Sequence, residues 1–372
     1  MPTEGYYYEL PVSSIQRAAQ TRNVKRKGYM KRREPFIQLN SGLTKETIVN
    51  LLALDDFTPV YEAADRVREE NVGEIVHLRA IIEFSNICKR RCIYCGLNRD
   101  NEDLPRFRMT HEEIVETARE AVEAGYRTIV LQSGEDPWFT PERLGAIIED
   151  IKKLRVAVTV SCGEMSEEDY AFLKSKGADR YLLKHETADP KLYNKLHPCG
   201  TLENRTNCLK TIHKLGYETG SGFMIGLPGQ TLETIAEDLL LLQEIPCQMA
   251  GIGPFISNPK TALAGEKNGD PELTRRAVAL ARLILPKANL PVTTALSILS
   301  EDEAQGTKSR SGTAGATENP FAFGANVVMK KVTPDEYKEA YEIYPADFKP
   351  TDIAGDRKEL EDIIRSYGRE PL

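Results

Sequence analysis

Three cysteines close together are the residues with the clearest capacity for chemistry in this sequence. Cys88, Cys92 and Cys95 follow a CxxxCxxC spacing in the segment NICKRRCIYCGLN. Structural zinc needs four ligands, and His111 and Cys162 would have to fold in from a distance to supply one. A redox CxxC uses only two thiols, in a thioredoxin-like context that is missing here. We therefore favour an iron–sulfur cluster, in which three thiolates leave one of four irons open to a small molecule.

Polar residues that could hold a small charged cofactor follow two later apolar stretches. LQSGEDP covers residues 131–137, and KHETADP contains Lys184 and Glu186, which share one face of a strand by its period of two. In ENRTNC, Arg205 could pair with a carboxylate through two N–H groups. Taken alone, SGEDP is also a good turn and Arg205 also a surface ion-pair residue, so both interpretations stay open at this point.

A regular alternation of short strands and helices is predicted around these residues. The eight predicted strands are 77–84, 126–132, 156–162, 179–185, 218–226, 248–255, 291–296 and 324–329. Amphipathic helical patterns such as 111–125, 141–154 and 231–244 lie between them. Eight such repeats favour a parallel (βα)8 TIM-type barrel, with an open doubly wound sheet as the alternative. In a barrel, residues that follow different strands meet at one face, so the cysteines and the polar residues would lie together.

The barrel is predicted over residues 44–345, including two leading helices between 44 and 70 that form an N-terminal helical extension. Residues 1–43 form an N-terminal arm that is strongly basic over 22–35, and residues 346–372 form a C-terminal tail. The segment 300–323 is rich in Gly, Thr and Ser and predicts a long loop before the last strand.

Composition sets limits on the class of protein. Of the 372 residues, 41% are hydrophobic, which is typical of a globular protein. The net charge of −7 argues against nucleic-acid binding by the whole surface. No apolar run approaches the roughly 18 residues of a membrane span, and the opening MPTEGYYYEL has no export-signal pattern. We expect a cytoplasmic protein in which the seven cysteines do not form disulfides. Metal or redox chemistry is expected of the three clustered cysteines, whereas Cys162, Cys199, Cys208 and Cys247 are scattered and are expected to be small buried or neutral residues.

The cysteine motif, with Tyr94 directly before its third cysteine on the first strand–helix loop of a barrel, resembles the radical SAM superfamily. The resemblance implies one 4Fe–4S cluster on Cys88, Cys92 and Cys95. S-adenosylmethionine (SAM) would chelate the open iron and be cleaved to a 5′-deoxyadenosyl radical. The cofactor contacts that the resemblance implies are Tyr94, Ser133, Gly134, Glu135, Lys184, Glu186 and Arg205.

Longer stretches are similar to one family within the superfamily, the HydE maturases of FeFe-hydrogenase. They include 77–101, 127–137, 178–190, 203–209, 226–231 (GLPGQT), 251–255 and 324–329. The resemblance implies assembly of the binuclear iron subcluster from a small anionic substrate, such as a cysteine-ligated iron carbonyl cyanide complex. It also implies a reducing electron donor and other hydrogenase maturases as partners. The substrate-binding residues that it implies are Arg79, Gln132, Thr159, Arg180, Thr293 and Thr294.

Other functions remain open on the sequence. A relative could act on an amino acid, as methylornithine synthase does, or insert sulfur, as biotin synthase does. No cysteine follows Cys247, so we expect no second cluster of the kind that sulfur insertion needs. A non-enzymatic cluster carrier would not need interior polar residues such as Arg79. A buried arginine does need an anion, although mutual pairing with Glu83 would also satisfy it. Lys184 stands where the resemblance leads us to expect arginine.

Overall fold

The computed structural model describes residues 9–11, 36–38, 43–293, 296, 319–346 and 349–372. Eight parallel strands run in the order β8-β7-β6-β5-β4-β3-β10-β9. Every predicted strand is confirmed, since each overlaps its predicted range. The strands are β3 Ile75–Ser85, β4 Thr128–Ser133, β5 Ala157–Ser161, β6 Arg180–Leu182, β7 Glu218–Ile225, β8 Met249–Pro254, β9 Pro291–Val292 and β10 Val327–Lys331.

The two ends of this strand order meet, so the sheet is a nearly closed barrel. Met249, the first residue of β8, forms a parallel bridge with Asn289, which lies just before β9. The Asn289 N–H donates to the Gln248 carbonyl at 2.8 Å, and the Ala250 N–H donates to the Asn289 carbonyl at 3.1 Å. These main-chain bonds join β8 to the residue just before β9, so the two ends of the strand order are connected. The predicted (βα)8 barrel is therefore confirmed over the alternative of an open sheet.

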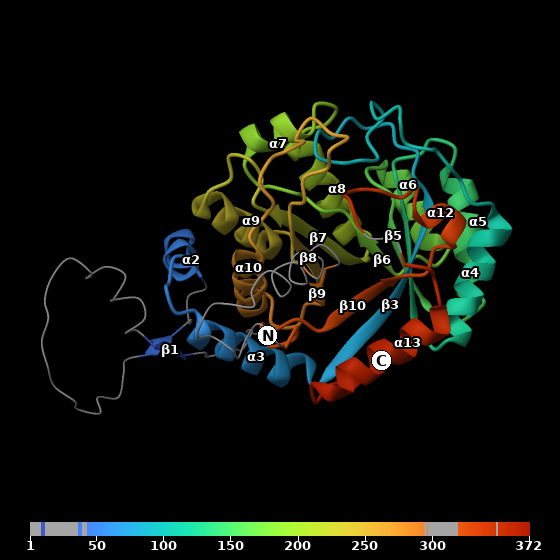
Figure 1. The fold of residues 1–372 in the computed structure, drawn as a ribbon. Helices are drawn as coiled ribbons and strands as arrows, with labels where there is room; N and C mark the ends of the chain where they lie inside the picture. The colour runs from blue at the N-terminus through green and yellow to red at the C-terminus, as the bar shows by residue number, and fades with distance from the viewer. Residues whose placement is uncertain (1–8, 12–35, 39–42, 294–295, 297–318, 347–348) are drawn as a thin grey trace, which may run out of the picture.

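Helices surround the barrel (Figure 1). Four of those that directly follow a strand begin at a Ser or Thr whose side chain accepts an N–H of the first turn, namely Thr110, Thr140, Ser166 and Thr231. Thr201 caps the second helix after β6 in the same way. Such caps fix where a strand–helix loop ends. The helices are α4 His111–Glu123, α5 Pro141–Lys152, α6 Glu167–Ser175, α7 Pro190–Leu196, α8 Leu202–Lys214, α9 Leu232–Glu244, α10 Pro271–Ile284, α12 Asp335–Lys338 and α13 Ile353–Ser366.

Strand residues alternate between the helix layer and the barrel interior. In β3, Leu78, Ile82 and Phe84 are almost fully buried in the main hydrophobic cluster, to which the helices contribute. Burial of each such side chain stabilises the fold by about 1.5–3 kcal/mol. Arg79 and Glu83 take the alternate positions and are also buried, so the barrel interior contains charged groups.

The flanking segments cover the outside of the barrel. The two predicted leading helices are confirmed as α2 Lys45–Leu52 and α3 Thr58–Val72. Near the C-terminus, β11 Glu370–Pro371 pairs in parallel with the first residues of β3. Figure 1 shows α13 and the loop after β3 at opposite ends of the barrel. The short strands β1 Glu9–Pro11 and β2 Phe36–Gln38 form an antiparallel pair, whereas the basic segment 22–35 and most of 300–323 lie outside the described residues.

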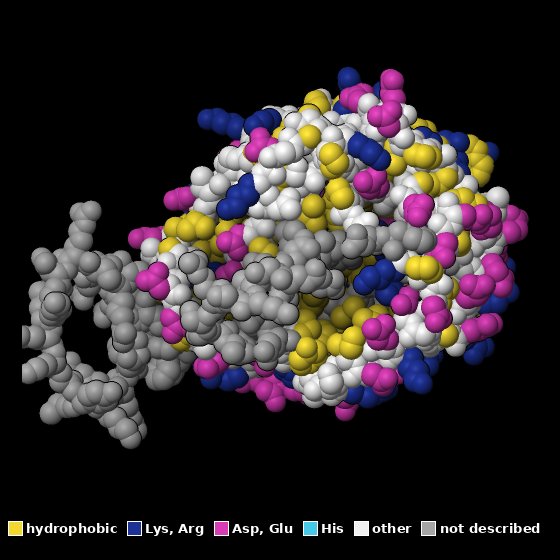
Figure 2. Space-filling view, viewed as in Figure 1, with side chains coloured by type: hydrophobic (Ala, Val, Ile, Leu, Met, Phe, Trp, Pro, Cys, Tyr) yellow, Lys and Arg dark blue, Asp and Glu magenta, His cyan; other side chains and the backbone are white. Residues whose placement is uncertain are grey.

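The described surface shows no segregation of charge on the face that Figure 2 draws, where basic and acidic side chains are interspersed. This distribution agrees with the modest net charge of −7. Within the described ranges, no helix has both the length and the apolar character that a bilayer crossing requires.

Candidate active site

The three cysteines lie in the loop that follows β3, and their thiols are half-buried. The Cys88 Sγ accepts hydrogen bonds from the main-chain N–H groups of Arg90 and Glu135, each at 3.4 Å. Burial raises the pKa of all three thiols, and the neighbouring Cys88 helps to raise that of Cys92 to about 12. Such thiols are electrostatically suited to a positively charged metal centre, which would hold them as thiolates. Among the described residues, no three His, Cys, Asp or Glu side chains are arranged to hold a single metal ion.

Arg106 holds the cysteine loop in shape, although its role has no signal in the sequence. Its Nη1 donates to the carbonyls of Asn86 at 2.7 Å and Leu97 at 2.9 Å. Its Nη2 donates to the carbonyls of Asn98 at 2.6 Å and Asn101 at 3.0 Å. One guanidinium therefore ties together the two ends of the segment that contains the cysteines.

The predicted cofactor turn after β4 lies directly against this loop. A Cβ atom on Gly134 would be 2.3 Å from the Ile87 carbonyl oxygen and 2.8 Å from the Cys88 Cβ, so this close approach requires glycine. The Ser133 Oγ donates to the Gly134 carbonyl at 2.7 Å, and the Lys89 N–H donates to the Glu135 carbonyl at 3.0 Å. The structure thus brings residues 133–135 together with the cysteines, as the sequence predicts.

Glu164, which is not among the residues predicted from the sequence, joins several of these segments. Its Oε1 accepts from Arg205 Nε at 2.7 Å, and its Oε2 accepts from Arg90 Nη2 at 2.9 Å and Asn204 Nδ2 at 2.6 Å. Arg90 Nε also donates to Glu135 Oε2 at 2.7 Å. Burial alone would raise the pKa of Glu164, but Arg205 and Arg90 hold it below its usual value. The signal that could have found Glu164 is its position just after a predicted strand.

Lys184 and Glu186 lie beside Arg205, whose Nη1 donates to the Lys184 carbonyl at 2.9 Å. Lys184 Nζ is 3.2 Å from Glu186 Oε2, but this buried oxygen accepts no hydrogen bond. Glu186 also has a backbone φ of 65°, which costs a residue with a side chain about 1–3 kcal/mol and is typical of functional sites. An oxygen that is ion-paired but accepts no hydrogen bond suits a hydroxyl group of a ligand.

The Tyr94 side chain is anchored to α7 by a histidine that the sequence did not single out. His197 Nδ1 lies 3.1 Å from the Tyr193 carbonyl and must donate to it, so Nε2 accepts from the Tyr94 hydroxyl at 3.0 Å. Burial lowers the pKa of His197 to about 4, which keeps the ring neutral. The His197 ring also stacks on Tyr193 at 4.1 Å between centroids. This arrangement fixes the orientation of the aromatic residue within the cysteine motif.

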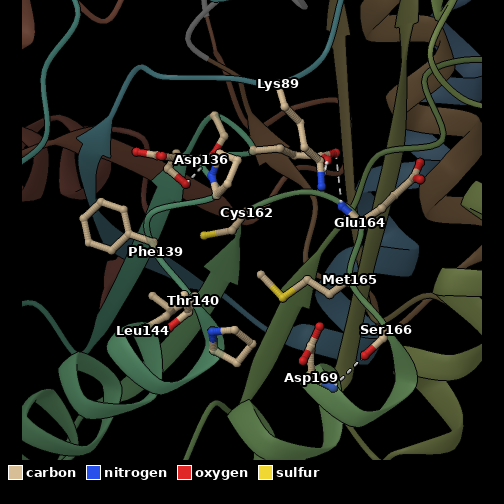
Figure 3. Close-up of a pocket in the computed structure, with 15 residues that line it drawn as sticks. Lys89, Asp136, Phe139, Thr140, Leu144, Cys162, Glu164, Met165, Ser166 and Asp169 are labelled. Atoms are coloured by element: carbon tan, nitrogen blue, oxygen red, sulfur yellow. Dashed lines mark hydrogen bonds and ion pairs between the residues drawn. The ribbon is translucent and has the colours of Figure 1, made fainter.

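A cavity of about 340 Å³ opens on the helix side of the turn after β4 (Figure 3). Figure 3 shows Lys89 and Asp169 at opposite ends of it, with Cys162 and Met165 between them. The cavity shares the turn with the predicted cofactor residues, but neither Glu186 nor Arg205 lines it. Its lining comprises Lys89, Ser133, Gly134, Glu135, Asp136, Pro137, Phe139, Thr140, Pro141, Leu144, Cys162, Glu164, Met165, Ser166 and Asp169.

A cavity of about 30 Å³ contains two of the predicted substrate residues, Arg79 and Thr159. Arg79 Nη1 donates to Met249 Sδ at 3.1 Å, while Arg79 Nε and Thr159 Oγ1 have no hydrogen-bond partner. Burial, with a smaller contribution from Arg180, lowers the pKa of Arg79 to about 10, so the side chain is still a cation at pH 7. A buried cation with an unused N–H suits an anion or a water molecule in the cavity.

Arg180 and Glu83 have partners outside this cavity. Arg180 Nε donates to Glu218 Oε2 at 2.7 Å, and its Nη1 donates to Thr128 Oγ1 at 3.3 Å. Glu83, the alternative partner for Arg79, instead pairs with Lys331 Nζ at 2.8 Å. Glu83 is therefore not the ion-pair partner of Arg79.

The remaining predicted substrate residues are further apart. Gln132 Nε2 donates to the Tyr341 hydroxyl at 3.3 Å. Thr293 lies against β8, where a Cβ atom on Gly253 would be 2.8 Å from Thr293 Oγ1. Thr294 lies outside the described residues. The structure thus brings Arg79 and Thr159 into one cavity and leaves Gln132, Arg180 and Thr293 out of its lining.

Comparison with known proteins identifies the family of this chain. The model of the radical SAM superfamily matches residues 82–242. HydE, an FeFe hydrogenase maturase subunit of Thermotoga maritima, is 50% identical over 305 residues, which are 81% of this chain and 84% of that protein. A 3-methylornithine synthase of Methanosarcina barkeri is 27% identical over 322 residues, or 86% of each chain. The crystal structure of methylornithine synthase (PylB) has a TM-score of 0.74 at 26% identity, over 89% of this chain and 94% of that one. The chain is a radical SAM enzyme and belongs to the HydE family.

Proposed function

We propose that this enzyme uses a 4Fe–4S cluster and SAM to assemble the binuclear iron subcluster of FeFe-hydrogenase. The observation that carries the proposal is the 50% identity to a HydE maturase over 81% of the chain. The group of three half-buried thiols at the end of β3 supports it. When bound, the cluster and SAM supply a 5′-deoxyadenosyl radical.

The proposed cofactor contacts come from the cysteine loop, the turn after β4, the segment after β6 and α8. Cys88, Cys92 and Cys95 would hold the cluster as thiolates. Arg205, oriented by Glu164, would pair with the SAM carboxylate. Glu186 Oε2, which accepts no hydrogen bond, would accept one from a ribose hydroxyl, and the turn after β4 would receive the amino group. The proposed contacts besides the cysteines and Arg205 comprise Tyr94, Ser133, Gly134, Glu135, Lys184 and Glu186.

The proposed substrate is anionic, and Arg79 is the residue that supports this choice. Arg79 lines a cavity of about 30 Å³, which has room for one small group only, and its Nε–H has no hydrogen-bond partner. A cyanide or carboxylate group of a cysteine-ligated iron carbonyl cyanide complex could enter there, with the bulk of the complex nearer the cysteines. An ammonium group would be repelled by the arginine. Gln132, Thr159, Arg180, Thr293 and Thr294 stay in the proposed substrate-binding set.

The proposed partners and location follow from the same assignment. The enzyme would work in the cytoplasm with a reducing electron donor and with other hydrogenase maturases. The relatives from methylornithine synthesis make an amino-acid substrate the competing proposal, because one of them shares the fold over 89% of this chain.

A comparison of two substrates tests the proposal. Anaerobically reconstituted enzyme receives SAM, a strong reductant and either the cysteine-ligated iron carbonyl cyanide complex or lysine. We expect the iron complex to be consumed in a SAM-dependent reaction to an adenosylated or dimer-forming iron species, while lysine leaves SAM cleavage at its background rate. Deuterium transfer from labelled lysine into 5′-deoxyadenosine would replace the proposal with the amino-acid alternative.

A further inference from the structure

Asp238 in α9 is a buried carboxylate, and two of its three partners lie on either side of Glu186 in the sequence. Its side chain is 0% exposed. The Ala188 N–H donates to its Oδ1, and Gln230 Nε2 donates to its Oδ2 at 3.3 Å. The His185 ring completes the surroundings, with Nε2 3.7 Å from Oδ1. Within the described part of the chain, Asp238 has no lysine or arginine partner, so its burial is costly unless these contacts serve a purpose.

His185 connects this carboxylate to the neighbouring strand. Ser221 Oγ accepts the main-chain N–H of His185 at 3.2 Å and lies 2.9 Å from the ring Nδ1. The serine hydroxyl is thereby free to donate to Nδ1, which would place the ring proton on Nε2. Nε2 is 3.7 Å from Asp238 Oδ1 and has no hydrogen-bond partner, so the histidine contacts Asp238 without a hydrogen bond. The set resembles the serine, histidine and acid of a hydrolase, but all three residues are 0% exposed. No substrate could reach the serine, so these contacts stabilise the local structure and do not activate the serine as a nucleophile.

The segment held in this way contains Glu186. Its N–H donates to the Gly222 carbonyl at 3.0 Å, and its carbonyl accepts from the Met224 N–H at 3.2 Å. The residue before it is fixed by Ser221 and the second residue after it, Ala188, is fixed by Asp238. The left-handed backbone of Glu186 is therefore enclosed by anchors on both sides, which is what a conformation costing about 1–3 kcal/mol needs in order to persist.

Gln230, within the GLPGQT stretch, ties a second loop to the same carboxylate. Its Oε1 accepts the Gly226 N–H at 2.7 Å, and its Nε2 donates to the Met224 carbonyl at 2.8 Å as well as to Asp238. Met224 is also the residue that donates to the Glu186 carbonyl. The loop after β7 and the loop after β6 thus share Asp238 as a common acceptor.

We propose that Asp238 is a positioning residue that acts through Glu186, by fixing the loop after β6 so that the Glu186 carboxylate is presented to SAM. This inference rests on the proposed role of Glu186 as a SAM contact. Loss of Asp238 would let Glu186 relax toward an ordinary backbone conformation and move its Oε2 away from the position in which it would accept from SAM. The cysteine loop makes none of these contacts, so cluster binding would not change.

The test compares SAM affinity, iron content and thermal stability in reconstituted enzyme. We expect Asp238→Ala to raise the Kd for SAM about tenfold while keeping about four irons per chain. Asp238→Asn should have a smaller effect of the same kind, because its amide oxygen still accepts from Ala188 but its NH2 opposes Gln230. Leu242→Ala is the matched control, since Leu242 is a buried residue of the same helix, one turn beyond Asp238, whose side chain has no polar atom to hold either loop. It should lower Tm and leave the Kd for SAM unchanged.

A double-mutant cycle separates positioning from general destabilisation. If Asp238 acts through Glu186, adding Asp238→Ala to Glu186→Gln should change the Kd for SAM by less than about twofold. Additive effects would overturn the inference, as would an unchanged Kd in both Asp238 variants. If Asp238→Ala does not fold, Asp238→Asn takes its place in the cycle with the same criteria. Failure of the wild-type enzyme to bind SAM would instead overturn the proposed function, and this inference with it.

Discussion

The guanidinium of Arg205 and the carboxylate of Glu164 form a nearly buried ion pair, with Nε donating to Oε1 at 2.7 Å and side-chain exposures of 11% and 5%. The second oxygen of Glu164 accepts from Arg90 in the cysteine loop at 2.9 Å. One carboxylate therefore sets the positions of two arginines that come from α8 and from the loop after β3. A buried ion pair of this kind is stable only while both partners are present, because loss of one partner leaves the other charge buried and unpaired.

Glu164→Gln should weaken SAM binding because it removes the charge that orients Arg205. The expected loss is about 1.5–3 kcal/mol, the scale of a charge-assisted hydrogen bond, and Arg205→Ala should lose a similar amount. Equilibrium binding of SAM to the reconstituted enzyme measures both. Glu237→Gln, on the exposed side of α9, is the control. Since the two residues act together, the double variant should bind no more weakly than Arg205→Ala, and additive losses would contradict the link between them.

If Cys88, Cys92 and Cys95 hold the cluster, cysteine-to-alanine variants should divide into those that lose it and those that keep it. Changing Cys88, Cys92 or Cys95 to Ala should abolish the cluster, because each removes one of three thiolates. Cys162→Ala and Cys199→Ala should keep about four irons per chain. Iron analysis and the visible absorbance of the reconstituted protein measure the outcome. A full cluster in the Cys92 variant would show that the assignment is wrong.

Arg106→Ala should make the cluster labile without removing a ligand. The side chain donates to four carbonyls of the cysteine loop, and each such bond contributes about 0.5–1.5 kcal/mol. We expect iron release to a chelator to become at least about tenfold faster, which corresponds to 1.4 kcal/mol. Arg99→Ala, an exposed change in the same loop, is the control. Equal release rates for the two variants would mean that the loop keeps its shape without Arg106.

Arg79→Ala should suppress reaction of the iron complex and leave background SAM cleavage intact. The reason is that Arg79 faces the small interior cavity and would pair with the anion, whereas none of its contacts reaches the proposed SAM residues. Arg79→Lys, which keeps the charge, should retain part of the reaction. Rates of SAM cleavage and of iron-complex consumption, measured together, check this. A parallel loss of both activities would indicate that Arg79 only supports the barrel.

Asp136→Asn should reduce stability at neutral pH but not in acid. Burial would raise the pKa of Asp136, but hydrogen bonds from Arg108, Ser85 and the Trp138 N–H hold it below its usual value. Because the folded pKa is lower than the unfolded one, the carboxylate stabilises the native state above about pH 4 and loses this effect as the pH falls further. Urea unfolding at pH 7 should give the variant a free energy of unfolding about 1.5–3 kcal/mol below that of the wild type, and this difference should shrink toward pH 3. A deficit that is independent of pH would mean that packing, and not charge, is what Asn disturbs.

The sequence by itself determined the strands and helices of the barrel and the grouping of the three cysteines, because both are encoded locally. Period-two runs and amphipathic patterns predict all eight strands, and their number favours a closed barrel over an open sheet. The contacts between Met249 and Asn289 in the folded chain decide between the two. The spacing of Cys88, Cys92 and Cys95 is likewise a property of eight consecutive residues. Placement of residues 133–135 beside the cysteines follows too, since parallel strands present their C-terminal ends at one face.

Only the tertiary structure decided which polar side chains meet. Glu164 pairs with Arg205 across 41 residues of sequence, and Asp238 reaches Ala188 across 50. Such pairs have no spacing rule, because loop conformation and rotamers set them after the barrel has formed. The same reason explains why Arg180 points to Glu218 while Arg79 keeps an unused N–H in the interior. Periodicity assigns a residue to a face of a strand, but the partner it finds there depends on the neighbouring strands, which only the folded chain brings together.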